Sequence, residues 1–184
     1  MISLDNETRK LITPQKALEL LKQGNERFVN NLKMNRNLLN QMNETSDGQF
    51  PFAIILSCID SRTSAELIFD QGLGDIFSCR IAGNIINDDI IGSMEFACKV
   101  AGAKLIMVLG HTKCGAIKGA CDNVKLGSLT GLLKKIQPAM KLEKDTKKTD
   151  RHSENSIFVE HVANLNVSVA MKQISKRSRI LKNM

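Results

Sequence analysis

Three residues of this sequence carry side chains that bind soft or borderline metal ions. Cys58 ends one apolar run, and His111 and Cys114 follow another in the spacing His-x-x-Cys. Two thiolates and one imidazole are a common zinc ligand set, and three protein ligands leave one coordination position open, as catalytic zinc sites do. On its own, His-x-x-Cys is weak evidence, because an isolated cysteine is most often a small core residue. The metal hypothesis therefore depends on a fold that brings all three ligands together.

The elements around these ligands predict such a convergence. Apolar runs at 52–58, 75–81 and 104–110 are typical of strands buried on both faces, and helical patterns separate them. This alternation indicates an α/β fold, with a parallel β-sheet core flanked by helices. Functional groups in such sheets gather beyond the carboxyl ends of the strands, where all three candidate ligands lie. If the first and third strands are neighbours, the ligands meet.

Helices and loops fill the rest of the chain, which we expect to form a single domain over residues 1–184. An N-terminal helical arm (1–50) precedes the core with the candidate site (51–124), and a helical C-terminal part (125–184) follows. Helical spacing and end signals predict helices at 13–32, 64–71, 88–102, 114–123, 128–142 and 157–174, and polar composition predicts loops at 33–50 and 143–153.

Composition narrows the class of protein. The 184 residues are 42% hydrophobic and 24% charged, which is ordinary for a globular protein and excludes a disordered or collagen-like chain. No apolar run approaches the roughly 20 residues of a membrane span. The polar N-terminus does not resemble a secretory signal, so we expect a cytoplasmic protein without membrane contact. Five cysteines are an odd number, and without export we expect them to be reduced.

The net charge of +7 lies in the last third of the chain, because basic and acidic residues balance up to residue 120. Its densest part runs from 134 to 151. We interpret this part as a solvated surface, since the chain has no Trp or Tyr for base stacking and no recognisable nucleic-acid-binding module. A nucleic-acid partner is therefore not expected.

An acidic and a basic residue directly follow the first candidate ligand. Asp60 and Arg62 would lie just beyond a buried strand, where an ionisable pair is costly unless it has a function. The segment 58–62 (Cys-Ile-Asp-Ser-Arg), together with 111–115 (His-Thr-Lys-Cys-Gly), resembles the signature of the β-class carbonic anhydrases. The segment 80–84 (Arg-Ile-Ala-Gly-Asn) resembles that family's second-strand motif. The resemblance extends from the N-terminal helix to the end of the chain.

The resemblance implies a function and a set of site residues. It implies zinc ligation by Cys58, His111 and Cys114, and a catalytic pair formed by Asp60 and Arg62. The family interconverts carbon dioxide and bicarbonate through zinc-bound hydroxide. Its members assemble from dimers, so we expect a homodimer or a higher homo-oligomer.

The resemblance also implies three substrate-binding positions. Gln41 resembles a family glutamine that lines the pocket of the neighbouring subunit, although a solvated loop amide is an equally good interpretation. Gly83 and Gly115 are expected to allow close approach of the backbone.

The chemistry of the residues agrees with this function. Zinc lowers the pKa of a bound water, and the resulting hydroxide can attack carbon dioxide. Two thiolates cancel the charge of the metal, so the water should be acidified less than at a site of three imidazoles. Asp60 can accept a hydrogen bond from the hydroxide, and Arg62 can hold Asp60 ionised. In some members the equivalent carboxylate moves onto zinc, so Asp60 is also a candidate fourth ligand of a closed state.

Two features depart from the family pattern. Ile55 stands where some members have an aromatic residue of a second, inhibitory bicarbonate site, so we do not expect that site although Arg80 is present. The chain also lacks the last family strands, which leaves the apolar strand at 105–109 without its expected neighbour. An open apolar edge is an aggregation hazard unless a partner or the C-terminal helix covers it.

Two alternative functions would use the same ligands. A hydrolase of carbon disulfide or carbonyl sulfide could be built on this scaffold, and a non-catalytic zinc or redox protein could use the oxidisable thiolates. Asp60 and Arg62 argue against the non-catalytic alternative, whereas the missing strands argue for it. The remaining sulfur and imidazole groups are interpreted as core thiols (Cys79, Cys98, Cys121) and as surface or structural histidines (His152, His161).

Overall fold

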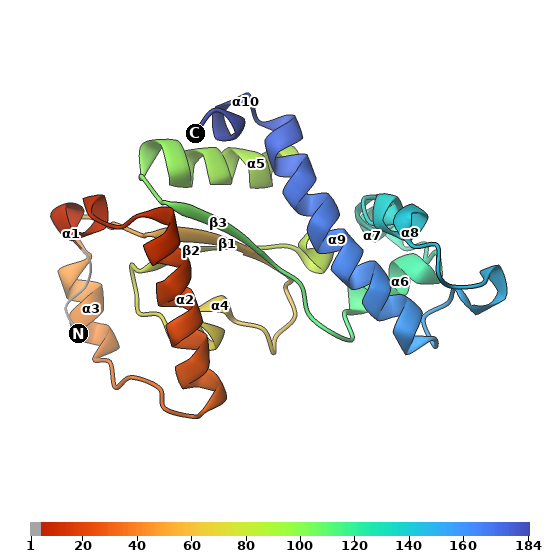
Figure 1. Cartoon of the computed structure of the whole chain (residues 1–184), viewed down its shortest axis with the longest axis horizontal. Coiled ribbons are helices and arrows are strands. Elements are labelled where there is room, and N and C mark those ends of the chain that lie inside the picture. The colour runs from red at the N-terminus through yellow and green to blue at the C-terminus, as the bar shows by residue number, and fades with distance from the viewer. Residues whose placement is uncertain (1–4) are drawn as a thin grey trace.

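The computed structural model describes residues 5–184, and its centre is a sheet of three parallel strands (Figure 1). The strands are β1 (Ala53–Ser57), β2 (Ile76–Arg80) and β3 (Leu105–Leu109), in the order β2-β1-β3. Each is one residue shorter at either end than the run that predicted it. The first residues of all three strands are paired with one another, and so are the last residues. The carboxyl ends of all three strands therefore lie at the same end of the sheet, as the α/β prediction requires.

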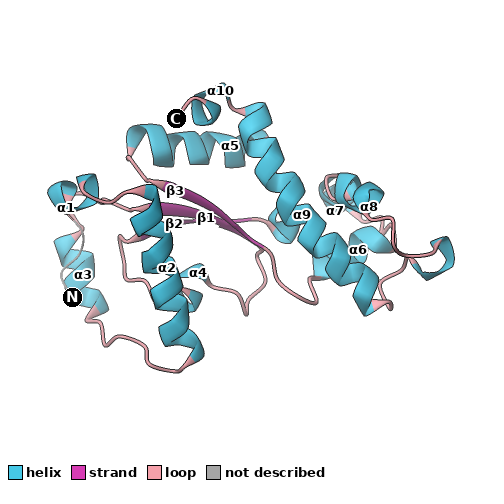
Figure 2. Ribbon diagram, in the orientation of Figure 1, coloured by secondary structure: helices cyan, strands magenta, loops and turns pink. Residues whose placement is uncertain are grey.

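Helices cover both faces of the sheet and extend past its carboxyl end (Figure 2). Side chains of β1 alternate between the two faces, so that Ile55 packs toward α2 and α4 while Ile54 and Leu56 pack toward α5 and α9. A third apolar cluster, formed by α6 to α9, lies beyond the strands. The helices are α1 (Asn6–Lys10), α2 (Pro14–Val29), α3 (Leu38–Glu44), α4 (Ala65–Ile68), α5 (Asp88–Glu95), α6 (Gly115–Cys121), α7 (Gly127–Lys134), α8 (Gln137–Leu142), α9 (Ser156–Arg177) and α10 (Arg179–Lys182).

The shorter helical pieces were predicted less well than the strands. Residues 33–50 contain α3, which begins after Asn37 because the Asn37 side chain accepts a hydrogen bond from the backbone of Asn40. The single helix predicted at 128–142 is two helices. Pro138 lacks the N–H that a continuous helix needs at that position, and α7 ends at Lys134. The helix predicted at 88–102 changes after Glu95 into a wider π-helical turn, η2 (Phe96–Val100).

The strand β3 was expected to lack a neighbour on its outer edge, which a partner or the C-terminal helix would then cover. Within residues 5–184, β3 is paired with β1 alone, and all five of its residues are only partly buried. Helix α9 packs against β3 without joining its edge as a strand would (Figure 1). Within the described part of the chain, β3 therefore has no neighbouring strand on its outer edge, as predicted. None of the helices in that part is long and apolar enough to cross a membrane.

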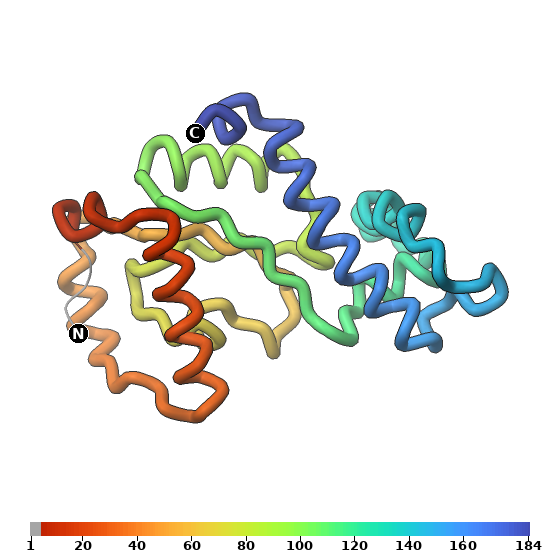
Figure 3. The backbone as a smooth tube through the Cα atoms, in the orientation of Figure 1, coloured from red at the N-terminus to blue at the C-terminus, as the bar shows by residue number. Residues whose placement is uncertain are grey.

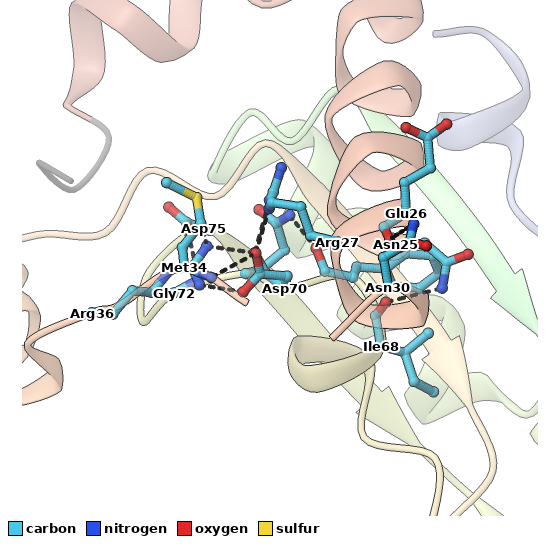
Figure 4. A network of polar contacts seen from close by, with 12 residues as sticks. Asn25, Glu26, Arg27, Asn30, Met34, Arg36, Ile68, Asp70, Gly72 and Asp75 are labelled. Carbon is cyan, nitrogen blue, oxygen red and sulfur yellow. Dashed lines mark hydrogen bonds and ion pairs between the residues drawn. The ribbon is translucent and has the colours of Figure 1, made fainter. Parts of the chain in front are cut away.

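A buried carboxylate joins α2 and the segment before α3 to the end of α4 (Figure 4). Asp70, just after α4, accepts hydrogen bonds from Arg27 in α2 and from Arg36 ahead of α3, and also from the backbone of Met34. Only 3% of the Asp70 side chain is exposed. These three residues, Asp70, Arg27 and Arg36, form what we call the arginine clamp.

Candidate metal centre

The three predicted ligands meet beyond the carboxyl end of the sheet. Cys58 follows β1, and His111 and Cys114 follow β3, its paired neighbour. The backbone segments that leave these two strands do so at the same end of the sheet (Figure 3). The Sγ atoms of the two cysteines are 3.9 Å apart, and a ligand atom from each of the three residues lies within 4.8 Å of the other two. Both cysteines are buried, and 11% of the His111 side chain is exposed. The parallel pairing of β1 with β3 is what brings these distant residues together.

His111 is oriented as a metal ligand. Its Nδ1 lies 2.9 Å from the carbonyl oxygen of Thr112, and this contact favours the proton on Nδ1. The lone pair of Nε2 is then available to bind a metal ion. Nε2 is buried and has no hydrogen-bond partner among residues 5–184. A buried, unpartnered nitrogen beside two thiols is costly unless a cation binds there. The residues of this site therefore fit a zinc ion.

Main-chain N–H groups face both sulfur atoms. The backbone N–H of Gly83 donates to Cys58 Sγ at 3.3 Å. Burial raises the pKa of the Cys114 thiol, while N–H groups of Ile117 and Ala116 in the first turn of α6 act in the opposite direction. Such donors stabilise thiolates in a buried site, and a bound cation stabilises them much further.

Asp60 and Arg62 form a two-point ion pair beside the ligands. Asp60 Oδ1 accepts from Arg62 Nε at 2.9 Å, and Oδ2 accepts from Nη2 at 2.8 Å. The hydrogen bonds from Arg62 hold the pKa of the Asp60 carboxyl well below its usual range. Asp60 Oδ2 is 3.9 Å from His111 Nε2, so the carboxylate adjoins the metal centre while it remains paired with Arg62.

Arg80 holds the loop that carries this pair. Its Nε donates to the carbonyl oxygen of Cys58 at 3.0 Å, and its Nη2 donates to the carbonyl oxygen of Asp60 at 2.6 Å. Sequence reasoning considered Arg80 only for a second bicarbonate site. Arg80 is the last residue of β2, which pairs with β1, and this position could have predicted its contact with the loop after β1.

Comparisons with known proteins agree with this geometry. The family model described as carbonic anhydrase matches residues 53–184, which is well over half of the chain. The chain belongs to the β-class carbonic anhydrase family. It is 44% identical over 119 residues to carbonic anhydrase 2 of Mycobacterium tuberculosis, and 36% identical over 135 residues to a carbonic anhydrase of Mycolicibacterium smegmatis.

The chain spans less than two thirds of the length of these two relatives. The matches cover 64% and 70% of this chain, but only 58% and 66% of the two mycobacterial carbonic anhydrases. Among solved structures, the β-carbonic anhydrase CcaA superposes with a TM-score of 0.68 at 25% identity, over 92% of this chain and 76% of that one. A β-carbonic anhydrase of Sordaria macrospora, described as tetrameric, gives a TM-score of 0.65 at 22% identity, over 77% and 73% of the two chains.

The three substrate-binding positions expected for a β-class carbonic anhydrase lie in different places. Gln41 is a buried residue of α3, not a solvated loop amide, and its Oε1 accepts a hydrogen bond from Leu73 at 3.3 Å. Leu73 shortly precedes β2, so Gln41 lies near the amino ends of the strands, away from the metal centre of its own chain. Gly83 adjoins Cys58. Among residues 5–184, a Cβ on Gly115 would meet no atom within 4 Å, so these residues do not provide the expected close approach.

The remaining cysteines and histidines lie outside the centre. Cys98 and Cys121 are buried as predicted, and burial raises the pKa of the Cys121 thiol to about 11. Cys79 is only partly buried. His152 is exposed, and the Nδ1 atom of His161 lies 3.5 Å from a carboxylate oxygen of Glu143.

Proposed function

We propose that this chain is a zinc-dependent enzyme that hydrates carbon dioxide reversibly to bicarbonate and a proton. The observation that carries the proposal is the convergence of Cys58, His111 and Cys114 around an unpartnered His111 Nε2. The family match and the mycobacterial relatives named carbonic anhydrase support it. Zinc held by these three residues would lower the pKa of a coordinated water and so supply hydroxide near neutral pH.

Asp60 and Arg62 are proposed as the catalytic pair. The lowered pKa of Asp60 keeps its carboxylate ionised at neutral pH, so it can only accept hydrogen bonds. In that state Asp60 orients the attacking water toward carbon dioxide, and Arg62 fixes the orientation of Asp60. Because 65% of the Arg62 side chain is exposed, the pair can separate at low cost. Asp60 is thereby also proposed as a fourth ligand in a closed state.

The proposed enzyme acts as a homodimer or higher homo-oligomer in the cytoplasm. Gln41 is too far from the metal centre of its own chain to line that pocket, so its substrate-binding role requires a neighbouring subunit. Gly83 and Gly115 are proposed to lie along the substrate's path. The cytoplasmic location is supported by the thiol ligands, which must remain reduced to bind zinc.

Stopped-flow hydration of carbon dioxide, with zinc measured on the same sample, tests the function. We expect about one zinc per chain by the three-ligand argument, and hydration that is lost together with zinc in His111→Ala. His152→Ala, which changes an exposed histidine, is the matched control and should retain both. A folded wild-type chain with a full complement of zinc and no hydration would refute the proposal. Sedimentation of the same sample measures the oligomeric state.

A further inference from the structure

Helix α9 carries a buried amide that is not one of the proposed metal ligands. Asn166 lies in α9 and is 2% exposed. Its Nδ2 donates a hydrogen bond to the carbonyl oxygen of Gly83 at 2.8 Å. Asparagine is a poor residue for a helix interior, and a buried amide requires partners. The contact with Gly83 is therefore the feature that needs an explanation.

Gly83 connects Asn166 to the metal centre. The carbonyl group of Gly83 receives the Asn166 amide, while the N–H group of the same residue donates to Cys58 Sγ at 3.3 Å. Gly83 forms the middle of a short 3-10 turn, η1 (Ala82–Asn84), and has a φ of 67°. This left-handed conformation is accessible to glycine, which is also free to leave it. A hydrogen bond to its carbonyl group restricts that freedom.

Packing around Gly83 explains why the restraint comes from another element. A Cβ at this position would lie 3.0 Å from Ile136 Cδ1 and 3.2 Å from Ala116 Cβ, and its residue would have to adopt the left-handed φ, so a larger residue would strain the turn instead of stiffening it. The restraint must come from outside the turn. Asn166 supplies it from a helix 83 positions further along the chain.

We infer that Asn166 is a positioning residue that directs the Gly83 N–H at the Cys58 sulfur. A hydrogen bond to a metal-bound thiolate withdraws electron density from sulfur, and it also fixes the direction in which the sulfur faces the metal. Outer hydrogen bonds of this kind change metal affinity by about 10–100-fold. The inference rests on the proposed metal centre, but it does not depend on carbon dioxide being the substrate.

Cobalt substitution distinguishes this role from simple packing. In the Co²⁺ protein, thiolate-to-metal charge-transfer bands report the electron density on sulfur. Asn166→Asp keeps the shape of the side chain but replaces the amide donor with a carboxylate. We expect these bands to move to lower energy and the zinc affinity, measured by chelator competition, to fall about 10–100-fold. Asn164→Asp adds the same charge at an exposed position of α9 and should leave both readouts unchanged.

The outcomes separate the inference from the proposed function. A folded Asn166→Asp protein with unchanged bands and affinity would overturn the positioning role, even if the protein is less stable. If that variant does not fold, the uncharged Asn166→Ala in the protein loaded with ¹¹³Cd decides: loss of the scalar coupling between cadmium and the Gly83 amide proton, relative to the wild-type protein, supports the inference, and an unchanged coupling overturns it. A wild-type chain that binds no metal would instead refute the metal centre itself.

Discussion

Two of the aspartate–arginine arrangements in residues 5–184 differ in burial and in how far apart the partners lie in the sequence. Asp60 pairs with Arg62 two residues later, and 65% of the arginine side chain is exposed. Asp70 pairs with Arg27 and Arg36, which lie 43 and 34 residues away. The side chains of Asp70 and Arg36 are 3% and 8% exposed. Both aspartates have a lowered pKa, so the direction of the shift does not separate their roles.

Burial and connectivity do separate them. The Asp60 pair lies within one loop, so breaking it moves few other groups, and water can solvate the arginine when it leaves. The arginine clamp joins α2, the segment before α3 and the end of α4. Removing one partner there leaves a charge in a place that water does not reach. The first arrangement suits a residue that must act on a substrate, and the second suits a permanent structural contact.

The largest expected effect is on activity, in Asp60→Asn. The amide retains the shape of the side chain but cannot remain an anionic acceptor, so the attacking water loses its orientation. Loss of a catalytic acid–base group costs about 10²–10⁴-fold in rate, and we expect a fall in that range in stopped-flow hydration per bound zinc. Zinc content and the urea unfolding midpoint should stay at wild-type values. A variant that keeps its rate would show that Asp60 is only a loop residue.

The next effect is on stability, in Asp70→Asn. Arg36 then remains buried and loses its ion-pair partner, and among residues 5–184 only the charge interaction with Asp75 is left. Breaking a buried pair in this way costs about 3–5 kcal/mol in the free energy of unfolding. Urea unfolding of the metal-loaded proteins measures this cost. Asp47→Asn, at an exposed position, is the matched control and should change little. Hydration per zinc in the folded fraction should be unaffected, in contrast to Asp60→Asn. Equal stability of Asp70→Asn and the control would refute the structural role of the clamp.

The two arginines of the clamp should differ in importance. Both arginines donate to the carboxylate and to the carbonyl oxygen of Asp70, but the Arg36 side chain is 8% exposed and that of Arg27 is 30% exposed. We expect Arg36→Met to cost about 3 kcal/mol, because a buried carboxylate loses the more deeply buried of its two arginine partners. Arg27→Met should cost about 1 kcal/mol, the value of an ordinary hydrogen bond at a partly solvated site. The reverse order in urea unfolding would mean that solvent reaches Arg36 more readily than Arg27.

The sequence predicted the metal centre better than the clamp for a physical reason. Cysteine and histidine at strand ends are few, and the parallel sheet allows few arrangements of three apolar strands. Those constraints were enough to predict that Cys58 and His111 lie close together. Aspartate and arginine occur throughout the chain, and no periodic pattern marks which pair meets across 34 or 43 residues. The contact between Asn166 and Gly83 was missed for the same reason.

Other misses came from local signals that were present but not used. Pro138 was a sufficient sign that the helix expected over 128–142 would be interrupted. Asn37 was a sufficient N-cap for α3, where only a loop was expected. The interior position of Gln41 could not be read from its polar neighbours, because its partner Leu73 lies in a turn 32 residues away.

The smallest expected effect is the acid dependence of the clamp. Burial alone would raise the pKa of Asp70, but hydrogen bonds from Arg27 and Arg36 outweigh it, so the folded pKa lies below the ordinary value of 3.8. A carboxyl with a lowered folded pKa stabilises the fold fully above its unfolded pKa and loses that contribution as the pH falls through the folded value. The stability gap between wild type and Asp70→Asn should therefore be constant above about pH 5 and narrow below it, in urea unfolding from neutral to acidic pH. A gap that widens toward acid would mean that the pKa of Asp70 is higher in the folded than in the unfolded protein. That result would contradict an ionised Asp70 held by the two arginines of the clamp.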